Sequence, residues 1–434
     1  MAISKWLIQR RLVVSRGTLG FPQKILTSRS FQNWSALNGT LVVDISHINY
    51  VNISEDLSTA TIAAGAKLGQ IYEILDQTGH TMIAGICPTV ALGGYLGVGG
   101  YNMQMRVEGM AVDHIRSIKT VLANGSTVTA SASENPDLFW ASRGGGTYGF
   151  TVEATIETAV LPRSAMLWMN FTGPTRTEAT QKYLDWASHQ DPHFNSQLNL
   201  YGGYAGVVGW YLGKTVEELT AIVKPSGLLD VPGVNYTITG NCSTENSRNY
   251  WQYTQTTCTD DATAHEAFNT EYNVVPDDFT PVPGAVAQYG FDDVPILPNQ
   301  TKAKPWNRVS IINKTYFVTK SKPLDQETIE YIVEKSGALP AELSFWTEMT
   351  IFNISVPATS AFPWQEEAQY LFRFEVVRST NATLQAIGQK FMDDLDAYLI
   401  PRIGYFSSSS SPCPQLLLVL TNVQVRQLCR LRRR

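Results

Sequence analysis

The strongest constraint on the fold of this chain is a glycine-rich run at residues 85–100. Its sequence, GICPTVALGGYLGVGG, contains six glycines and one cysteine and no charged residue. Glycine is used this densely where the backbone must approach a partner closely or adopt a positive φ. Because the run offers no charge, we expect a large, flat, partly apolar partner that receives backbone N–H donors, and a hydrated cation does not fit. The alternative is a glycine-rich surface loop without a ligand.

Two common nucleotide-binding loops do not match this run. A P-loop needs G-K-[ST], so that lysine and a hydroxyl reach phosphate and magnesium, and no lysine lies between Lys67 and Lys119. A dinucleotide-binding turn needs G-x-G-x-x-G between a strand and a helix. The GVGG at residues 97–100 breaks that spacing, and no helical pattern opens directly behind it.

The segments before the run predict two buried strands and a helix. Residues 39–46 (GTLVVDIS) and 60–66 (ATIAAGA) are short and apolar, as expected of buried strands. Residues 67–80 carry apolar side chains at helical spacing, and Gly79 is a suitable stop signal for that helix.

The segments after the run predict a hairpin, a helix and a strand. Residues 115–123 and 127–130 flank Asn124-Gly125, a strong hairpin signal. Asn135-Pro136 provides an N-cap and an N1 proline for a helix through residue 143, followed by three glycines and a strand at 149–156.

In this order and spacing, the chain resembles the berberine bridge enzyme-like family of FAD-dependent oxidases, which has a vanillyl-alcohol oxidase/p-cresol methylhydroxylase (PCMH)-type FAD-binding domain. The resemblance is carried by GTLVVDIS, ATIAAGAKLGQIYEIL, GICPTVALGGYLGVGG, DHIRSIKTVLANGSTVTAS and NPDLFWASRGGGTYGF. It is specific from about residue 39 to 161 and weaker to about residue 399, where GVVGWYLGKTVEEL, INKTYFVTKSKPLDQETIEYIV and VPATSAFPWQ look like landmarks of the family's substrate domain.

The resemblance implies an α+β fold with two lobes. We expect a PCMH-type FAD-binding domain at residues 39–161 and a substrate domain at 162–399 with an antiparallel sheet backed by helices. Residues 1–38 and 400–434 do not match the family, and we expect the tail to be irregular. The family's first βα subdomain and its tyrosine-containing final segment are not recognised. We attribute the first gap to an N-terminally incomplete gene model and the second to a translated intron or a shifted frame, with a natural basic anchor as the alternative for the tail.

The resemblance also implies a set of FAD-binding residues. In relatives the cysteine of G-x-C-P-T-V forms a thioether to the flavin ring, and Cys87 occupies that position; the alternative is a buried free thiol. We expect no second attachment through histidine if the sequence is as written, because no histidine precedes His47. The expected cofactor-binding residues are Cys87, Pro88, Thr89, Val90, Gly93, Gly94, Gly99, Gly100, Val112, Asp113, Gly144, Gly145, Gly146, Gly149 and Val152.

The catalytic base is not identified by the sequence. It must lie within hydrogen-bond reach of the substrate hydroxyl whose carbon gives up a hydride. The candidates are Tyr201, Tyr204, Tyr211, Glu348 and Tyr398, each of which could equally be an ordinary core or surface residue.

The composition of the chain limits the classes of partner that it can bind. With 434 residues, of which 44% are hydrophobic, the chain can bury two sizeable cores. A formal charge of −5 with mixed signs argues against nucleic acid, which would favour a basic face. We expect a small-molecule substrate and O₂ as partners, no membrane span, no metal and a monomeric protein. A zinc site at His189 and His193 is not expected, because the acid of H-E-x-x-H is missing.

Glycosylation signals point to the secretory pathway. Eleven asparagines begin N-x-[ST], more than chance would give, and we expect a secreted glycoprotein, although residues 1–20 contain no signal peptide. Cys242 and Cys258 could pair in an oxidising compartment.

These observations lead to one main hypothesis, an FAD-dependent oxidase acting on an alcohol, sugar or secondary-metabolite carbon. Two alternatives stay open: a catalytically impaired family member, and a dehydrogenase or reductase of secondary metabolism on the same fold. The substrate cannot be predicted, because fold does not determine function.

Overall fold

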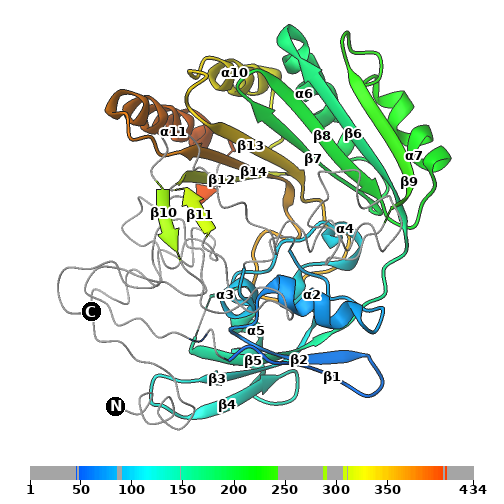
Figure 1. Ribbon diagram of the computed structural model, residues 1–434, viewed down its shortest axis with the longest axis vertical. Coiled ribbons are helices and arrows are strands. Elements are labelled where there is room, and N and C mark those ends of the chain that lie inside the picture. Colours follow the sequence, from blue (N-terminus) through cyan, green and yellow to red (C-terminus); the bar gives the residue numbers. More distant parts are fainter. Residues whose placement is uncertain are drawn as a thin grey trace.

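The computed structural model describes Ile45 and residues 48–85, 90–146, 148–242, 287–290, 306–309, 311–403 and 406–407. They form two lobes, each built on an antiparallel sheet (Figure 1). The predicted strand at residues 39–46 lies outside the described residues except for Ile45.

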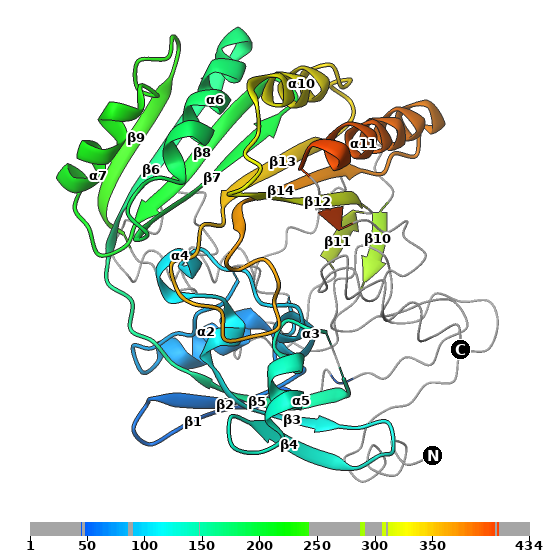
Figure 2. The same cartoon turned by 180° about the vertical axis from the view of Figure 1, so that it is seen from behind.

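The first lobe contains a five-stranded sheet in the order β1-β2-β5-β3-β4. Its strands are β1 (Val51–Ile53), β2 (Thr59–Ala63), β3 (Ile115–Val121), β4 (Thr127–Ser131) and β5 (Phe150–Glu157). Its helices are α2 (Leu68–Asp76), α3 (Leu92–Gly97), α4 (Met105–Glu108) and α5 (Pro136–Ser142). Helices α2, α3 and α5 lie on the side of this sheet that faces the second lobe (Figures 1 and 2).

The second lobe contains an eight-stranded antiparallel sheet in the order β15-β12-β14-β13-β7-β8-β6-β9. Its strands are β6 (Ser164–Thr172), β7 (Phe194–Tyr201), β8 (Tyr204–Tyr211), β9 (Asn235–Cys242), β12 (Ile311–Thr319), β13 (Phe345–Ile351), β14 (Ala368–Val377) and β15 (Phe406–Ser407). The helices α6 (Arg176–Ala187), α7 (Val216–Val223), α10 (Gln326–Gly337) and α11 (Ala382–Ile403) cover the face of this sheet away from the first lobe (Figures 1 and 2). Strands β10 (Ala287–Gly290) and β11 (Trp306–Val309) pair separately.

The large sheet has one apolar and one polar face because residues alternate along its strands. In β13, Phe345, Met349 and Ile351 belong to the core under the helices, whereas Glu348 and Thr350 lie on the opposite face. We call that opposite face, which is turned toward the first lobe, the inner face. The polar face is therefore placed where a substrate between the lobes would meet it.

The predicted elements of the first lobe are confirmed, with shifts at their ends. Strand β2, helix α2, the β3–β4 hairpin with Gly125 at φ 86°, helix α5 and strand β5 all lie where the sequence places them. At the start of α5 the capping is different from the prediction. Asn135 is left-handed and its side chain does not cap the helix; its amide Nδ2 donates instead to Thr129 O at 2.7 Å.

Part of the glycine-rich run, for which the sequence predicts no helix, is helical. Helix α3 spans Leu92–Gly97, with Leu92 and Leu96 almost fully buried. Each buried leucine contributes about 2 kcal/mol, against about 1 kcal/mol lost for each glycine in a helix. Gly93 also lies so close to Ala64 that an added Cβ would be 2.9 Å from the Ala64 Cβ. Burial therefore outweighs the poor helix propensity.

Three further observations bear on the expectations. Residues 400–403 belong to α11 rather than to an irregular tail. Among the described residues, no helix has both the length and the apolar character needed to cross a membrane. Cys242 is in a disulfide, but the other cysteines lie outside the described residues, so its pairing with Cys258 stays a prediction.

Candidate active site

The structure brings the two glycine-rich segments together. The amide of Gly146 donates to the carbonyl of Gly97 at 2.9 Å, which joins the segment after α5 to the end of α3. Residues 93–100 and 144–146, which contain the predicted cofactor-binding residues Gly93, Gly94, Gly99, Gly100 and Gly144 to Gly146, therefore form one side-chain-poor seam in the first lobe. We use the term glycine seam for these two segments.

Most glycines of the seam are required by packing within the protein. An added Cβ would lie 2.5 Å from Ala111 at Gly100 and 2.3 Å from a carbonyl oxygen of Ala141 at Gly145. The same holds for Gly149, whose Cβ would lie 2.5 Å from a hydroxyl of Thr120. Distances under 3 Å cannot be accommodated without movement, so at these positions glycine is explained without a ligand.

Gly94 and Gly146 are different, because among the described residues, chain neighbours and the helix's own backbone aside, no atom lies within 4 Å of a Cβ added at either position. Gly94 is exposed, and Gly146 has a φ of 101° that other residues rarely adopt. The hydrogen bond from Gly146 to Gly97 links Gly146 to helix α3, which contains Gly94. The seam thus offers bare backbone to a flat partner, and in this respect the residues fit the FAD that the sequence predicts.

The remaining predicted cofactor residues are placed as follows. Cys87, Pro88 and Thr89 lie outside the described residues. Val90 accepts a backbone hydrogen bond from Leu68 at 2.9 Å, and Val152, in β5, accepts one from Ala64 at 2.8 Å. Their roles at the cofactor stay predictions.

Val112 and Asp113 have contacts that the sequence did not reveal. The Val112 amide donates to Gly99 O at 3.2 Å. The Asp113 carboxylate accepts hydrogen bonds from the Thr359 hydroxyl at 2.9 Å, the Gln365 amide at 3.0 Å and the Met110 amide at 2.8 Å. In the described contacts, Asp113 therefore links the first lobe to the second.

The partner of Asp113 is the connection between β13 and β14, residues 352–367, which we call the strap. It reaches from the large sheet to the first lobe and passes beside α2 and α3 (Figure 2). Arg143 Nη2 donates to Thr359 O at 2.5 Å, and the Ala361 amide donates to Arg143 O at 2.9 Å. Burial lowers the pKa of Arg143. Sequence reasoning recognised residues 356–365 only as a landmark of the substrate domain. It did not predict their contacts, because these join residues more than 200 positions apart.

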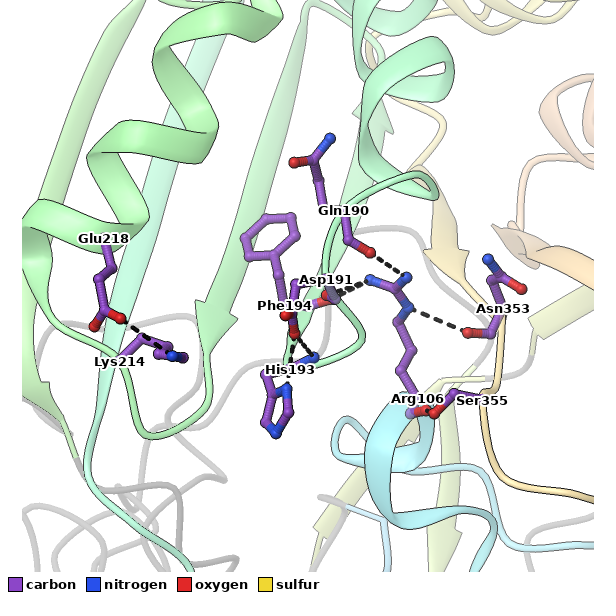
Figure 3. Close-up of polar contacts among 9 residues, drawn as sticks. All are labelled: Arg106, Gln190, Asp191, His193, Phe194, Lys214, Glu218, Asn353 and Ser355. Carbon is purple, nitrogen blue, oxygen red and sulfur yellow. Dashed lines mark hydrogen bonds and ion pairs between the residues drawn. The ribbon is translucent and has the colours of Figure 1, made fainter.

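Arg106, in α4, forms a second junction between the lobes (Figure 3). It is 1% exposed, and burial lowers its pKa to about 10. Its guanidinium donates to five backbone carbonyls of the second lobe, those of Ser188, Gln190, Asp191, Phe194 and Asn353. Its own carbonyl accepts from Ser355 N and Oγ at 2.9 and 2.6 Å. A charged residue thus fixes the two lobes against each other through carbonyl dipoles.

The residues that directly follow the glycine-rich run contact the inner face of the large sheet. The Tyr101 hydroxyl lies 3.3 Å from the Thr350 hydroxyl of β13, and Asn195 of β7 donates to Met103 O at 2.7 Å. From Thr350 the polar contacts continue to Gln197 at 3.3 Å and on to Asn199 at 2.8 Å. The seam therefore stands opposite a polar surface.

The structure divides the five candidate bases by sheet face. Strand register places Glu348 opposite Asn199 and Trp346 opposite Tyr201, so Glu348 and Tyr201 share the inner face. Tyr204 stacks on Tyr201, with ring centroids 4.3 Å apart.

The other two candidates are on the outer side. Tyr211 packs in the core beneath the helices. Tyr398, on α11, stacks on Tyr331 of α10 with ring centroids 3.6 Å apart. Neither faces the first lobe, so we do not retain these two as candidates. A sequence that identifies a strand or a helix does not identify which of its faces will be covered.

Electrostatics distinguishes the remaining candidates. Burial, with smaller contributions from Tyr204 and Glu348, raises the pKa of Tyr201 to about 12. Glu348 forms an ion pair with Arg373 on the neighbouring strand β14, and Arg373 Nε also lies 3.1 Å from a carboxylate oxygen of Glu375. The inner face therefore presents an ionic cluster beside a tyrosine that stays neutral at pH 7.

His189 and His193 do not form a metal site with each other. His189 Nδ1 lies 2.8 Å from the backbone carbonyl of Asp185, and His193 Nδ1 lies 2.7 Å from the Asp191 carboxylate. In the part of the chain that the structure describes, no three His, Cys, Asp or Glu side chains gather in a way that could hold a metal ion.

Comparison with known proteins identifies the family to which this chain is similar. Residues 25–131 match the FAD binding domain. The FAD-linked oxidoreductase pytB of Aspergillus terreus is 42% identical, over 88% of this chain and 47% of its own length. The FAD-linked oxidoreductase pynB of Aspergillus niger is 41% identical, over 87% of this chain and 70% of its own length. The chain thus spans about half of one relative and more than two thirds of the other.

A solved structure shows the same fold. The chain superimposes on the Physcomitrella patens BBE-like 1 protein with a TM-score of 0.67 and 21% sequence identity, over 87% of this chain and 75% of that one. The match confirms the two-lobed α+β architecture expected from the sequence. The chain therefore belongs to the FAD-linked oxidoreductases and has the fold of the berberine bridge enzyme-like proteins.

Proposed function

We propose that this protein is an FAD-dependent oxidase that acts on an alcohol, sugar or secondary-metabolite carbon. The substrate carbon loses a hydride, its hydroxyl proton passes to a base on the inner face, and both electrons pass on to O₂ with protons to give H₂O₂. The observation that carries the proposal is the glycine seam. Its first segment, residues 93–100, lies in the matched FAD binding domain (residues 25–131), the Gly146–Gly97 hydrogen bond joins it to the second segment, and the next residue, Tyr101, contacts the polar inner face.

The residues that would hold FAD are the open backbone positions Gly94 and Gly146, with the flanking residues of both glycine segments. When bound, FAD supplies a two-electron acceptor. Cys87 lies in the same run, between Gly85 and Val90, and we propose that its sulfur forms a thioether to the flavin. The Gly85 carbonyl is held by the Tyr72 hydroxyl, which anchors the start of this segment.

The base is proposed to be Glu348. An efficient general base has a pKa near the operating pH, and the pKa of about 12 makes Tyr201 a poor choice at neutral pH. Glu348 lies on the same face, with its carboxylate held by Arg373. Asn199 and Gln197, which are buried beside it, would orient polar groups of the substrate.

Reoxidation kinetics test the proposal without knowledge of the substrate. The flavin of the purified protein is reduced chemically under argon and mixed with buffer that contains O₂ in a stopped-flow instrument. Fast reoxidation with stoichiometric H₂O₂ is expected. Slow reoxidation would assign a dehydrogenase or reductase, and a protein without flavin would remove the proposal altogether.

A second experiment tests the thioether. The Cys87→Ser variant is expected to release its flavin on acid precipitation, whereas the unmodified protein retains it. Flavin that stays bound to the acid-precipitated variant would show that the attachment is elsewhere.

We further propose that the protein enters the secretory pathway as a glycosylated monomer. Two observations support the secretory pathway and glycosylation: Cys242 forms a disulfide, which is typical of oxidising compartments, and several sequon asparagines are exposed. The exposed ones within the described residues are Asn52, Asn124, Asn170, Asn235, Asn241 and Asn381.

A further inference from the structure

One side chain of the second lobe lies between the two segments of the glycine seam. At Gly99, an added Cβ would lie 2.7 Å from Cδ2 of Phe362, and at Gly144 it would lie 2.7 Å from Cβ of the same residue. Both glycines have positive φ, 108° and 89°. Phe362, which belongs to the strap, thus contacts both segments that are proposed to receive the cofactor.

Phe362 is supported from behind by other aromatic rings. Its ring centroid lies 6.1 Å from that of Phe317 in β12 and 6.0 Å from that of Phe352 at the start of the strap. Trp364 stacks on the Phe317 ring at 5.1 Å with an interplanar angle of 13°. The Phe362 ring therefore belongs to an aromatic cluster that includes Phe317 of the large sheet.

The strap is also fastened on both sides of Phe362. Before it, the Thr359 hydroxyl donates to Asp113 and the Ala361 amide donates to Arg143 O. After it, the Gln365 amide donates to Asp113 at 3.0 Å. These contacts give Phe362 a defined position relative to the seam, because they allow the strap little freedom on either side.

We propose that Phe362 is a positioning residue for FAD: it acts through Gly99 and Gly144 and holds the seam in its cofactor-binding shape. The proposal rests on the proposed function, since it requires that FAD occupies the seam. Positive-φ glycines are conformationally permissive, and a rigid ring wedged between them removes that freedom. A side chain of the second lobe thereby fixes the shape of the cofactor-binding site in the first lobe.

The first test removes the ring. In Phe362→Ala, and to a smaller extent in Phe362→Leu, we expect a changed visible circular dichroism spectrum of the bound flavin. FAD affinity is measured in the Cys87→Ser background, where the cofactor is free to dissociate. There the Phe362→Ala change is expected to weaken binding about tenfold, within the range of coupling between residues in contact.

A matched control separates positioning from general loss of packing. Phe391, in α11, packs on Phe345 in the core beneath the helices, with ring centroids 5.1 Å apart, and belongs to the core cluster away from the seam. Phe391→Ala is expected to lower the melting temperature but to leave the flavin dichroism and FAD affinity unchanged. If Phe391→Ala shifts both as much as Phe362→Ala does, Phe362 acts through stability alone and the inference is wrong.

A pair of double-mutant cycles tests the contact itself. Gly99→Ala places a Cβ against ring atoms of Phe362, and Phe362→Ala removes those atoms; the second change should therefore recover part of the FAD affinity lost in the first. Gly144→Ala places a Cβ against the Cβ, N and Cα of Phe362, which alanine keeps. No recovery is expected there, and equal recovery in both cycles would contradict the assignment.

The outcomes distinguish this inference from the proposed function. A protein that binds no FAD when Phe362 is unchanged overturns the proposed function, and the inference with it. A protein that binds FAD with the same affinity and dichroism in the presence and absence of the Phe362 ring overturns the inference alone.

Discussion

At the scale of single residues, the inner face explains which groups can do chemistry. Glu348 and Tyr201 stand on adjacent strands, and the pKa of Tyr201 is raised to about 12. A neutral phenol donates a hydrogen bond to a substrate oxygen but does not take its proton at pH 7. The two residues are therefore assigned different roles, acceptance of a proton for Glu348 and orientation for Tyr201.

This division predicts a pH profile. If Tyr201 were the base, the rate of flavin reduction would rise about tenfold for each pH unit up to its pKa, because the deprotonated fraction rises in that proportion. We expect no such rise between pH 8 and about pH 10. Rapid-reaction measurements of flavin reduction across this interval provide the test, and a slope of one would reassign the base to Tyr201.

Substitution of the same residues gives the complementary result. Glu348→Gln is expected to lower the rate of flavin reduction by about 100-fold or more, the usual effect of losing a general base, with the flavin spectrum unchanged. Tyr211→Phe, on the outer side of the sheet, is the matched control and should leave the rate unchanged. Equal losses in both variants would exclude an inner-face base at Glu348.

Arg106 has a structural role, because it holds the two lobes together. Replacing it with methionine keeps most of its volume but leaves five carbonyls without their donor. We expect a loss of about 3 kcal/mol or more in the free energy of unfolding, because unpaired buried acceptors are costly. Denaturant unfolding measures the loss. Arg116→Met, at a side chain that is 67% exposed, is the control and should change stability little.

At the scale of elements, the strap is the feature that joins the lobes. Asp113→Ala would remove the acceptor of both Thr359 and Gln365. We expect residues 352–367 to become more sensitive to limited proteolysis while α6 and α10 stay protected. A cleavage pattern identical to that of the unmodified protein would mean that the Asp113 contacts do not hold the strap.

The elements also show how far the sequence could be interpreted. Asn124-Gly125 predicted the β3–β4 hairpin because the turn chemistry is local. Helix α3 was missed because the burial of Leu92 and Leu96 depends on tertiary packing that a count of glycines does not contain. Gly99 and Gly144 were recognised as special positions, but the reason, Phe362, comes from a segment far along the chain. Local chemistry could be predicted, whereas long-range partners could not.

At the scale of the whole molecule, the two lobes were expected from the family resemblance, and the fold comparison confirms them. The faces of the large sheet determine which of its residues matter for function. Of the five candidate bases, Tyr211 and Tyr398 could be set aside only when the helices were placed on the outer face.

The exposure of the sequon asparagines predicts which of them carry glycans. The exposed sequon asparagines should carry glycans, whereas Asn313 and Asn353 should not. The amide of Asn313 donates to Glu375 at 3.1 Å, and that of Asn353 donates to Ser188 O at 3.1 Å. Site mapping by mass spectrometry of protein from a eukaryotic secretory host tests this. Full occupancy at Asn353 would contradict its placement between the lobes.

The central claim is that the glycine seam holds FAD, and the most direct measurement is the flavin content of the purified protein expressed with added FAD. We predict close to one flavin per chain, with the visible spectrum of oxidised flavin. We also predict that Gly94→Val, which places a branched side chain at an exposed, open position of the seam without a positive φ, yields folded protein with little or no flavin. A colourless unmodified protein, or a Gly94→Val variant with full flavin content, would contradict the account.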